Sequence, residues 1–153
     1  MEIVNFDKEF VERTKWIVNN LSCQYEITLL LNCMLALVAL PTERTKGQQN
    51  GTVADAEFQK KCVNKLKEMG LLDGQKSSDG QIFRTVKNAL SHMYIEPENK
   101  GQVITHVKIC DKIPKEDRYH TELNFSVEQL KEFALYVADL HLERFENAKN
   151  TVE

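Results

Sequence analysis

The feature that most constrains the fold is an apolar run of fourteen residues, Ile27–Leu40, which only Thr28 and Asn32 interrupt. Its side chains are apolar on every side of a helical wheel, and such a helix must be covered by other elements. The run is too short to cross a bilayer as a helix. It therefore predicts a helix from about Tyr25 to Leu40 at the centre of a bundle, and Pro41 is expected to end it.

Asn32 is the polar exception inside this predicted central helix. A buried amide needs hydrogen-bond partners. We expect Asn32 to find them within the core. The alternative is a contact with the helix that ends near His92.

Four further segments place apolar residues three and four positions apart, and each predicts an amphipathic helix. The first is expected to begin near Asp7 as its N-cap, and the second to span about Ala54–Met69 and end at Gly70. The third should start at Ser78 or Asp79 and end soon after His92, and the last should start at the capping box of Ser126 and Gln129. Residues 42–53 and 73–80 are polar and glycine-containing, which predicts loops.

The segment before the last helix predicts a small β-hairpin. Tyr94–Ile95 and Val103–Ile109 are rich in β-branched and aromatic residues, and residues 97–101 between them favour a turn. Residues 111–124 are polar and are expected to be irregular. The predicted fold class is therefore mostly α: a bundle of four to five helices with one β-hairpin before the last helix, in a single domain over residues 1–153.

The charge balance argues against a protein that coats nucleic acid through bulk charge, since the net charge is −3. Residues 44–92 are nevertheless basic, with nine Lys and Arg against five Asp and Glu. Four of these lysines cluster in one predicted helix: Lys60, Lys61, Lys65 and Lys67. They form either a small nucleic-acid surface or the solvated outside of that helix, and the sequence leaves both open.

The four cysteines, at positions 23, 33, 62 and 110, form no CxxC pair and have no histidine at metal-ligand spacing. Cys33 and Cys62 fall in helical patterns and are expected to be small core residues. We therefore expect no metal and no cofactor. Residues 1–5 lack the basic and apolar regions of a signal peptide, so a cytoplasmic protein without a membrane span is expected.

The residues with the clearest chemical potential lie between Phe83 and Met93. Arg84, Asn88 and His92 recur every fourth residue and form one helical stripe beside an apolar face. Imidazole moves protons near neutral pH, and a guanidinium steadies phosphate charge. The stripe suits the handling of a phosphodiester. The alternative is a solvated outer face on which His92 answers the negative end of the helix dipole.

Two segments resemble proteins of the HEPN family. Asn88–His92 (Asn-Ala-Leu-Ser-His) is similar to the end of the HEPN motif helix, and Tyr25–Pro41 resembles the second helix of a short, single-domain HEPN group often found on bacterial mobile elements. The likeness covers about residues 4–147. It implies an up-and-down HEPN bundle that forms a homodimer, in which two motif helices build one composite site and cleave RNA without metal.

The family motif is an Arg, four to six intervening residues, and a His. The resemblance implies His92 as the catalytic acid or base, Lys87 or Arg84 as the cation, Asn88 as an orienting group, and RNA contacts from Arg84, Lys87 and Ser91. The match departs from the motif, because Lys87 stands in the Arg position and Arg84 lies seven intervening residues before His92. Helix geometry favours Arg84, which lies about 80° from His92 on a wheel against about 140° for Lys87.

The sequence thus leaves two functions open. The first is a metal-independent endoribonuclease of toxin or defence type, with RNA as substrate and a neutralising antitoxin protein as a partner. The second is a catalytically inactive dimer that binds RNA, a nucleotide or a protein. Lys87 in the Arg position is the residue that separates them, because lysine cannot clamp a phosphate in two places.

Overall fold

The computed structural model describes residues 3–21, 26–45, 51–74, 77–110 and 122–152. In chain order its elements are α1 (Ile3–Asn19), α2 (Glu26–Thr45), α3 (Gly51–Glu68), α4 (Asp79–His92), β1 (Ile95–Lys100), β2 (Val103–Cys110), β3 (Glu122–Ser126) and α5 (Val127–Val152). Helices dominate these ranges, and a small antiparallel sheet precedes the last helix, which confirms the predicted mostly α class. None of the described helices combines the length and apolar content of a membrane span.

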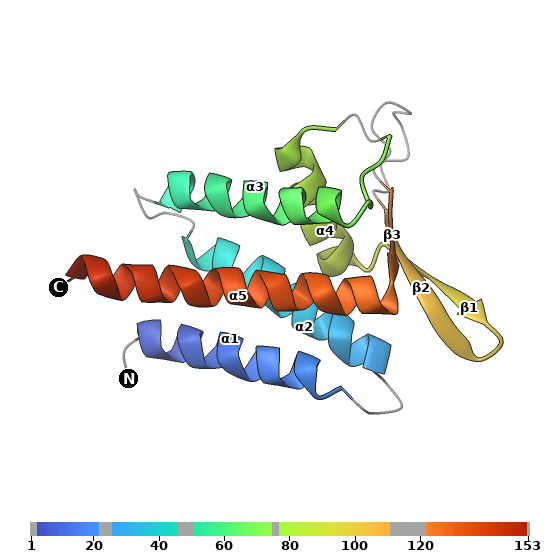
Figure 1. The fold of residues 1–153 in the computed structure, drawn as a ribbon, viewed down its shortest axis with the longest axis horizontal. Helices are drawn as coiled ribbons and strands as arrows, with labels where there is room; N and C mark the ends of the chain where they lie inside the picture. Colours follow the sequence, from blue (N-terminus) through green and yellow to red (C-terminus); the bar gives the residue numbers. More distant parts are fainter. Residues whose placement is uncertain (1–2, 22–25, 46–50, 75–76, 111–121, 153) are drawn as a thin grey trace.

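Helix α5 runs the length of the bundle and packs against α1, α2 and α3, while α4 packs against α2, α3 and β2 (Figure 1). Two ion pairs, Lys8 with Glu146 and Lys15 with Asp139, join α1 to α5. Both partners shift by seven residues, or about two helical turns, in opposite directions along the chain. The two pairs therefore fix α1 and α5 as antiparallel neighbours.

The core consists of the apolar stripes that the sequence predicts. The buried members include Val11 and Val18 of α1, Phe58, Cys62 and Leu66 of α3, Ile82, Phe83, Val86, Ala89 and Leu90 of α4, and Leu130, Phe133, Val137 and Leu140 of α5. Leu30, Cys33, Met34, Leu37 and Val38 of α2 are buried among them. The core is therefore assembled from one face of each helix.

Two capping boxes set the helix starts that position the site and the sheet. Ser78 accepts a hydrogen bond from the Gln81 backbone N–H, and the Gln81 side chain accepts one from the Ser78 N–H. Ser126 and Gln129 make the same reciprocal pair at the start of α5. Each box satisfies two of the N–H groups that a helix start leaves without partners, so both predicted starts are confirmed.

The boundaries of α1 and α2 differ from the prediction. Helix α1 begins at Ile3, so Asp7 lies inside it; neither glycine nor proline stands before Asp7 to delay the start. Helix α2 continues through Pro41 to Thr45, which also shortens the loop expected over residues 42–53. Proline lacks the N–H that would bond the carbonyl of Leu37, and a side chain from α5 satisfies that carbonyl instead.

The sheet is larger than the predicted hairpin. β1 extends to Lys100, and the turn is confined to residues 101 and 102, so Pro97 lies within a strand. Proline is tolerated there because β1 is an edge strand in the order β1-β2-β3. β3, over Glu122–Ser126, occupies part of the segment predicted to be irregular. The rest of that segment, residues 111–121, lies outside the described residues.

Asn32 is exposed, which contradicts its predicted burial in the core. Helix α2 is not covered on every side. Thr28 is exposed as well, and the neighbouring Leu31 and Leu35 are half-buried. Solvent can satisfy the Asn32 amide, so it needs no partner in the core. Composition alone could not show which stripe of this apolar helix would remain uncovered.

Candidate functional site

Helix α4 presents its polar stripe outward because its opposite face is committed to the core. Ile82, Phe83, Thr85, Val86, Ala89 and Leu90 are buried. The remaining positions carry the residues singled out in the sequence. Arg84, Ser91 and His92 are exposed, and Lys87 and Asn88 are half-buried. The structure thus places all five candidate residues on the outer side of one helix.

The end of α4 is shaped by Met93, the one non-glycine residue with a positive φ among the described residues. Its φ of 57° and ψ of 38° are left-handed, and the Tyr94 N–H bonds back to the carbonyl of Ala89 at 2.9 Å. Met93 is 69% exposed, because the left-handed turn takes it off the apolar face of α4. This turn ends the helix at His92, with Met93 as its C-cap.

The same turn brings a second ring to the histidine. The centroids of the His92 and Tyr94 rings lie 5.7 Å apart with planes tilted by 33°. The carbonyl of Tyr94 accepts a hydrogen bond from the N–H of Cys110, which ties this corner to β2. Tyr94 was predicted only as a strand residue. The sequence signal that could have revealed it is an aromatic residue two positions after the motif histidine.

Within one chain the candidate cations are borne by residues more than one helical turn before His92. The helical rise places Arg84 about 12 Å and Lys87 about 7.5 Å from His92 along the axis. Side chains on an α-helix lean toward its N-terminus, so the guanidinium of Arg84 extends away from His92. On the stripe of Arg84, Asn88 and His92, Asn88 is the residue nearest to His92, one helical turn before it.

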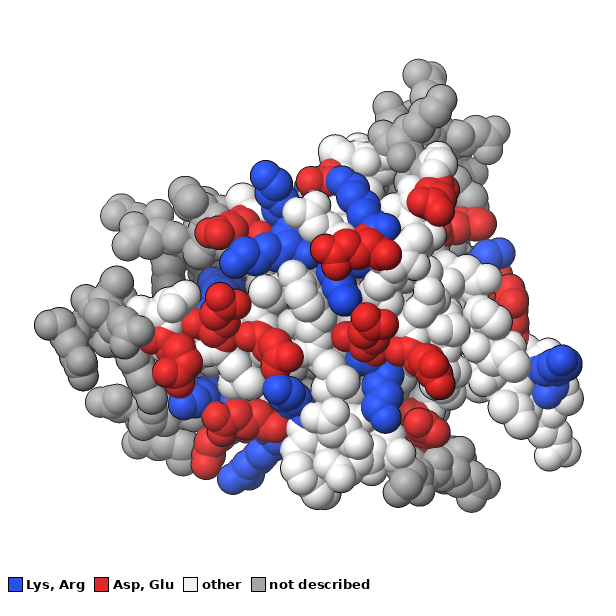
Figure 2. Space-filling model, viewed as in Figure 1, with Lys and Arg blue, Asp and Glu red and all other residues white. Residues whose placement is uncertain are grey.

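The predicted lysine cluster of α3 is largely engaged in ion pairs. Lys61 pairs with Glu57 at 3.7 Å, Lys65 with Glu132 at 3.0 Å, and Lys67 with Asp79 at 3.1 Å. Figure 2 shows cations and carboxylates interspersed over this face of the molecule. The hydrogen bond from Lys65 to Glu132 is also the largest cause of the raised pKa of Lys65. These pairings favour the interpretation of the lysines as a solvated helix surface.

The thiols of the described residues are buried in the core. Cys33, Cys62 and Cys110 are buried, as expected for Cys33 and Cys62, and Cys23 lies outside the described residues. Burial raises the pKa of the Cys62 thiol to about 12, so Cys62 is protonated at neutral pH and is no nucleophile. Within the described ranges, no cluster of three or more His, Cys, Asp and Glu side chains could hold a metal ion.

Comparison with known proteins gives one finding. Residues 1–148 match the model of a protein family described as HEPN pEK499 p136. No curated protein and no solved structure matches the chain significantly. The match covers nearly the whole chain, including α4 and its polar stripe.

Proposed function

The chain belongs to the HEPN family, and on that premise we propose that it is a metal-independent endoribonuclease of toxin or defence type. The observation that carries the proposal is the position of His92. Its imidazole is exposed at the end of α4, beside the ring of Tyr94, with the Asn88 amide one turn earlier and the Arg84 guanidinium two turns earlier. The core uses none of these polar groups.

The proposed reaction needs one proton acceptor, one proton donor and one cation. A base removes the proton of the ribose 2′-hydroxyl, and the 2′-oxygen then forms a bond to phosphorus. The bond from phosphorus to the 5′-oxygen breaks, and that oxygen receives a proton from an acid. His92 can serve in either proton transfer. A cation from Arg84 or Lys87 stabilises the charge that develops on the phosphorus oxygens.

The spacing within α4 supports a site composed of two chains. Within one protomer the backbone of Arg84 and of Lys87 lies more than one helical turn from that of His92, which favours a phosphate shared between two chains. In a two-fold dimer that pairs α4 with its copy, each His92 would face the cations of the other chain. We therefore propose an isologous homodimer with α4 in its interface.

The neighbouring helix supplies further surface for such a dimer. α4 packs against α2, and α2 presents the stripe Thr28, Leu31, Asn32 and Leu35 at helical spacing. The half-buried side chains of Leu31 and Leu35 give this stripe apolar surface that a second copy of the helix would cover. Size-exclusion chromatography with light scattering should give twice the chain mass of 17.7 kDa at micromolar concentration. A mass of one chain would count against the composite site.

The test of the activity is cleavage of single-stranded RNA by purified protein in the presence of EDTA. We expect cleavage in EDTA, because the proposed chemistry needs no metal. His92→Ala should lower the rate by at least about a hundredfold, the usual size of an acid–base contribution. His106→Ala is the matched control, because it removes a histidine from β2 without changing α4. Cleavage that continues at the wild-type rate in His92→Ala would contradict the role of His92 as the acid or base.

A second function is favoured by one observation, the lysine at position 87. A HEPN dimer without an effective cation would bind RNA, a nucleotide or a protein and cut nothing. Growth of a bacterial host on induction separates the two. The wild type should inhibit growth if it cuts RNA, and His92→Ala should relieve that inhibition. If the purified protein cuts no RNA, and Lys87→Arg does not activate it, the binding function stands.

A further inference from the structure

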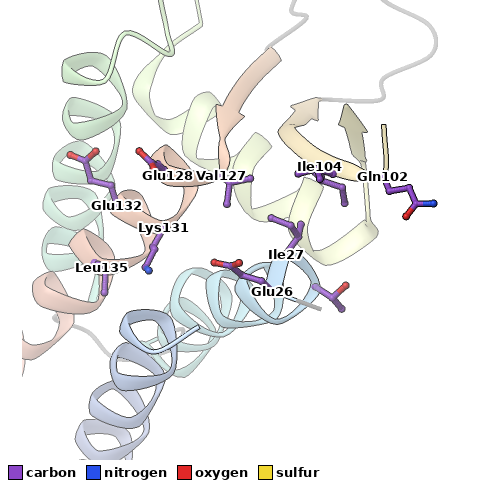
Figure 3. Close-up of a pocket in the computed structure, with 11 residues that line it drawn as sticks. Glu26, Ile27, Gln102, Ile104, Val127, Glu128, Lys131, Glu132 and Leu135 are labelled. Atoms are coloured by element: carbon purple, nitrogen blue, oxygen red, sulfur yellow. The ribbon is translucent and has the colours of Figure 1, made fainter. Parts of the chain in front are cut away.

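A broad groove opens where the sheet meets the bundle. It encloses about 920 Å³ and is lined by the start of α2, by β2 with the turn before it, and by the first turns of α5. Figure 3 shows Val127, Ile27 and Ile104 in its middle, between α5 and the hairpin. None of its lining residues belongs to α4, and Thr28 is the one residue that the groove shares with the α2 stripe proposed for the dimer.

The middle of the groove is apolar and partly open to solvent. Val103 is 66% exposed, which is unusual for a valine in a strand. Ile27, Ile104, Val127 and Leu135 are half-buried around it. Apolar side chains gathered in an open groove mark a surface that a partner covers.

The backbone of β2 is also open on this side. The ladder between β2 and β3 begins only at His106, because the chain turns into α5 after Ser126. Within the described residues, Val103 and Ile104 therefore have β1 on one side and no strand on the other. The groove lies on that unpaired side, between Ile104 and Val127 (Figure 3). Unpaired N–H and C=O groups on a strand edge accept an added strand.

The outer edge of β1 offers a contrast. It contains Pro97, which has no N–H to donate, between the exposed carboxylates of Glu96 and Glu98. Proline and charge are devices that discourage the addition of a strand. The edge of β2 over Val103 and Ile104 has neither device.

The charges around the groove are mainly negative. Glu26, Glu128 and Glu132 line it together with one cation, Lys131. Glu132 is held by Lys65 at 3.0 Å, whereas no ion pair engages Glu26 or Glu128 in the described part of the chain. An RNA strand would meet repulsion here. Two copies of the groove placed face to face would also bring these carboxylates together.

From the apolar middle, the open strand edge and the acidic lining, we propose that the groove binds an extended segment of a partner protein. The segment carries apolar side chains at alternate positions and Lys or Arg beside them. Its backbone adds as a short strand next to Val103 and Ile104, its apolar side chains fill the groove, and its cations face Glu26 and Glu128. The proposal does not depend on RNA cleavage or on His92.

Selection from a display library of random ten-residue peptides tests the proposal. We expect enriched peptides with apolar residues at a period of two and an excess of Lys and Arg over Asp and Glu. Enrichment of apolar residues three and four positions apart would assign the groove to a helix instead. Enrichment of acidic peptides, or no peptide that distinguishes the wild type from Val103→Ser, would overturn the proposal.

The affinity of the most enriched peptide, labelled with fluorescein, then tests the named residues by fluorescence anisotropy. Val103→Ser should weaken binding about tenfold through the lost apolar contact. Trp16→Ser is its matched control, because Trp16 is equally exposed, at 66%, but lies on α1; it should leave the affinity unchanged. Glu128→Lys should weaken binding at low salt more than at high salt, whereas Asp73→Lys, on an exposed turn, should not.

N-methylation of the peptide tests the strand edge directly. Two peptides are compared, one methylated on the odd and the other on the even backbone nitrogens. One should lose binding and the other keep it, because only one of these two sets of N–H groups points at β2. Equal affinity of both methylated peptides would exclude strand addition. A labelled single-stranded RNA oligomer serves as the competitor. Displacement of the peptide by this RNA, in the wild type and in His92→Ala alike, would assign the groove to nucleic acid and overturn the proposal.

Discussion

The imidazole Nε2 of His141 donates a hydrogen bond of 2.7 Å to the backbone carbonyl of Leu37, across the contact between α5 and α2. The carbonyl can only accept, so Nε2 carries the proton. Leu37 is the residue four positions before Pro41, and its carbonyl would bond the N–H of residue 41 in an unbroken helix. The ring of Phe58 stacks on the imidazole at 4.7 Å between centroids.

This contact explains why α2 passes through its proline. An unsatisfied buried carbonyl costs about 1–3 kcal/mol, and His141 removes that cost for Leu37. His141 is 2% exposed and lies one turn after Val137 and Ala138 in the buried stripe of α5. The helix break predicted at Pro41 was wrong because the group that compensates for the proline lies 104 residues away in the chain.

Removal of the His141 donor should destabilise the fold. His141→Phe keeps a ring beside Phe58 but leaves the Leu37 carbonyl without a donor, and it should lower the free energy of unfolding by about 1–3 kcal/mol. His141→Gln can still donate through its amide and should lose less. Urea unfolding monitored by circular dichroism measures both variants. Equal stabilities of His141→Phe and the wild type would show that the bond contributes nothing.

Acid should act through the same residue. The pKa of His141 is lowered to about 4: burial is the largest cause, the bond to Leu37 opposes it, and the charge of the nearby Arg144 adds to the lowering. The unfolded chain binds this proton near pH 6.5 and the folded chain only near pH 4. The stability that neutral His141 provides is therefore complete above about pH 6.5 and is lost as the pH falls toward about 4, by roughly 3 kcal/mol in all.

The measurement is the difference in unfolding free energy between the wild type and His141→Gln across this pH range. The subtraction removes the carboxylates, which titrate in both proteins. We expect the difference to shift against the wild type as the pH falls. A difference that stays constant would mean that His141 titrates normally in the folded protein.

Features that depend on neighbouring residues were predictable from the sequence. The capping boxes of Ser78 with Gln81 and of Ser126 with Gln129 involve residues three positions apart, and both are present. The buried stripes of α1, α3, α4 and α5 follow from helical periodicity in the same way. The helices and most of the core residues could therefore be predicted from residues close together in the sequence.

Features that depend on distant partners were not predictable. β3 has an alternating pattern in which Leu123 and Phe125 are buried, but it is too short to stand out without β2 beside it. Pro97 is tolerated only because its strand is an edge. The exposure of Asn32 depends on which stripe of α2 the other helices leave open. At the candidate site, the sequence indicated the stripe of α4, whereas the contact between His92 and Tyr94 depends on the left-handed turn at Met93.

Substitutions at two left-handed positions, Met93 and Gly101, should change the stability of the fold in opposite directions. A left-handed conformation costs a non-glycine residue roughly 1 kcal/mol, and the exposed side chain of Met93 gains little from burial. Because glycine also gains conformational freedom in the unfolded chain, Met93→Gly should stabilise the protein by only about 0.5 kcal/mol. Gly101, with a φ of 68° and open space around its Cβ position, should respond in reverse, so Gly101→Ala should destabilise. Met93→Ala controls for loss of the side chain and should change little.

In the proposed nuclease, Tyr94 either holds the imidazole of His92 in place through its ring or takes part in the reaction through its phenol. If the ring holds the imidazole of His92 in place, Tyr94→Phe should keep the RNA cleavage rate within a few-fold of the wild type, and Tyr94→Ala should lower it about tenfold or more. If the phenol takes part in the chemistry, Tyr94→Phe should be as impaired as Tyr94→Ala. Single-turnover cleavage rates distinguish the two outcomes. Wild-type rates in both variants would remove Tyr94 from the site.

Lys87 and Arg84 are the two candidates for the cation that stabilises the phosphate charge. Lys87 occupies the position that the family motif reserves for Arg, and Arg84 shares the helical stripe of His92. If Lys87 is the working cation, Lys87→Arg should raise the cleavage rate, because a guanidinium binds phosphate through two parallel hydrogen bonds. Arg84→Ala should then do little. If Arg84 is the working cation, Arg84→Ala should lower the rate by about a hundredfold or more, and Lys87→Arg should have no effect. Arg13→Ala, at an arginine whose side chain is 77% exposed on α1, controls for general loss of positive charge. An equal loss in Arg13→Ala and Arg84→Ala would assign the effect to the overall charge of the protein instead of the site.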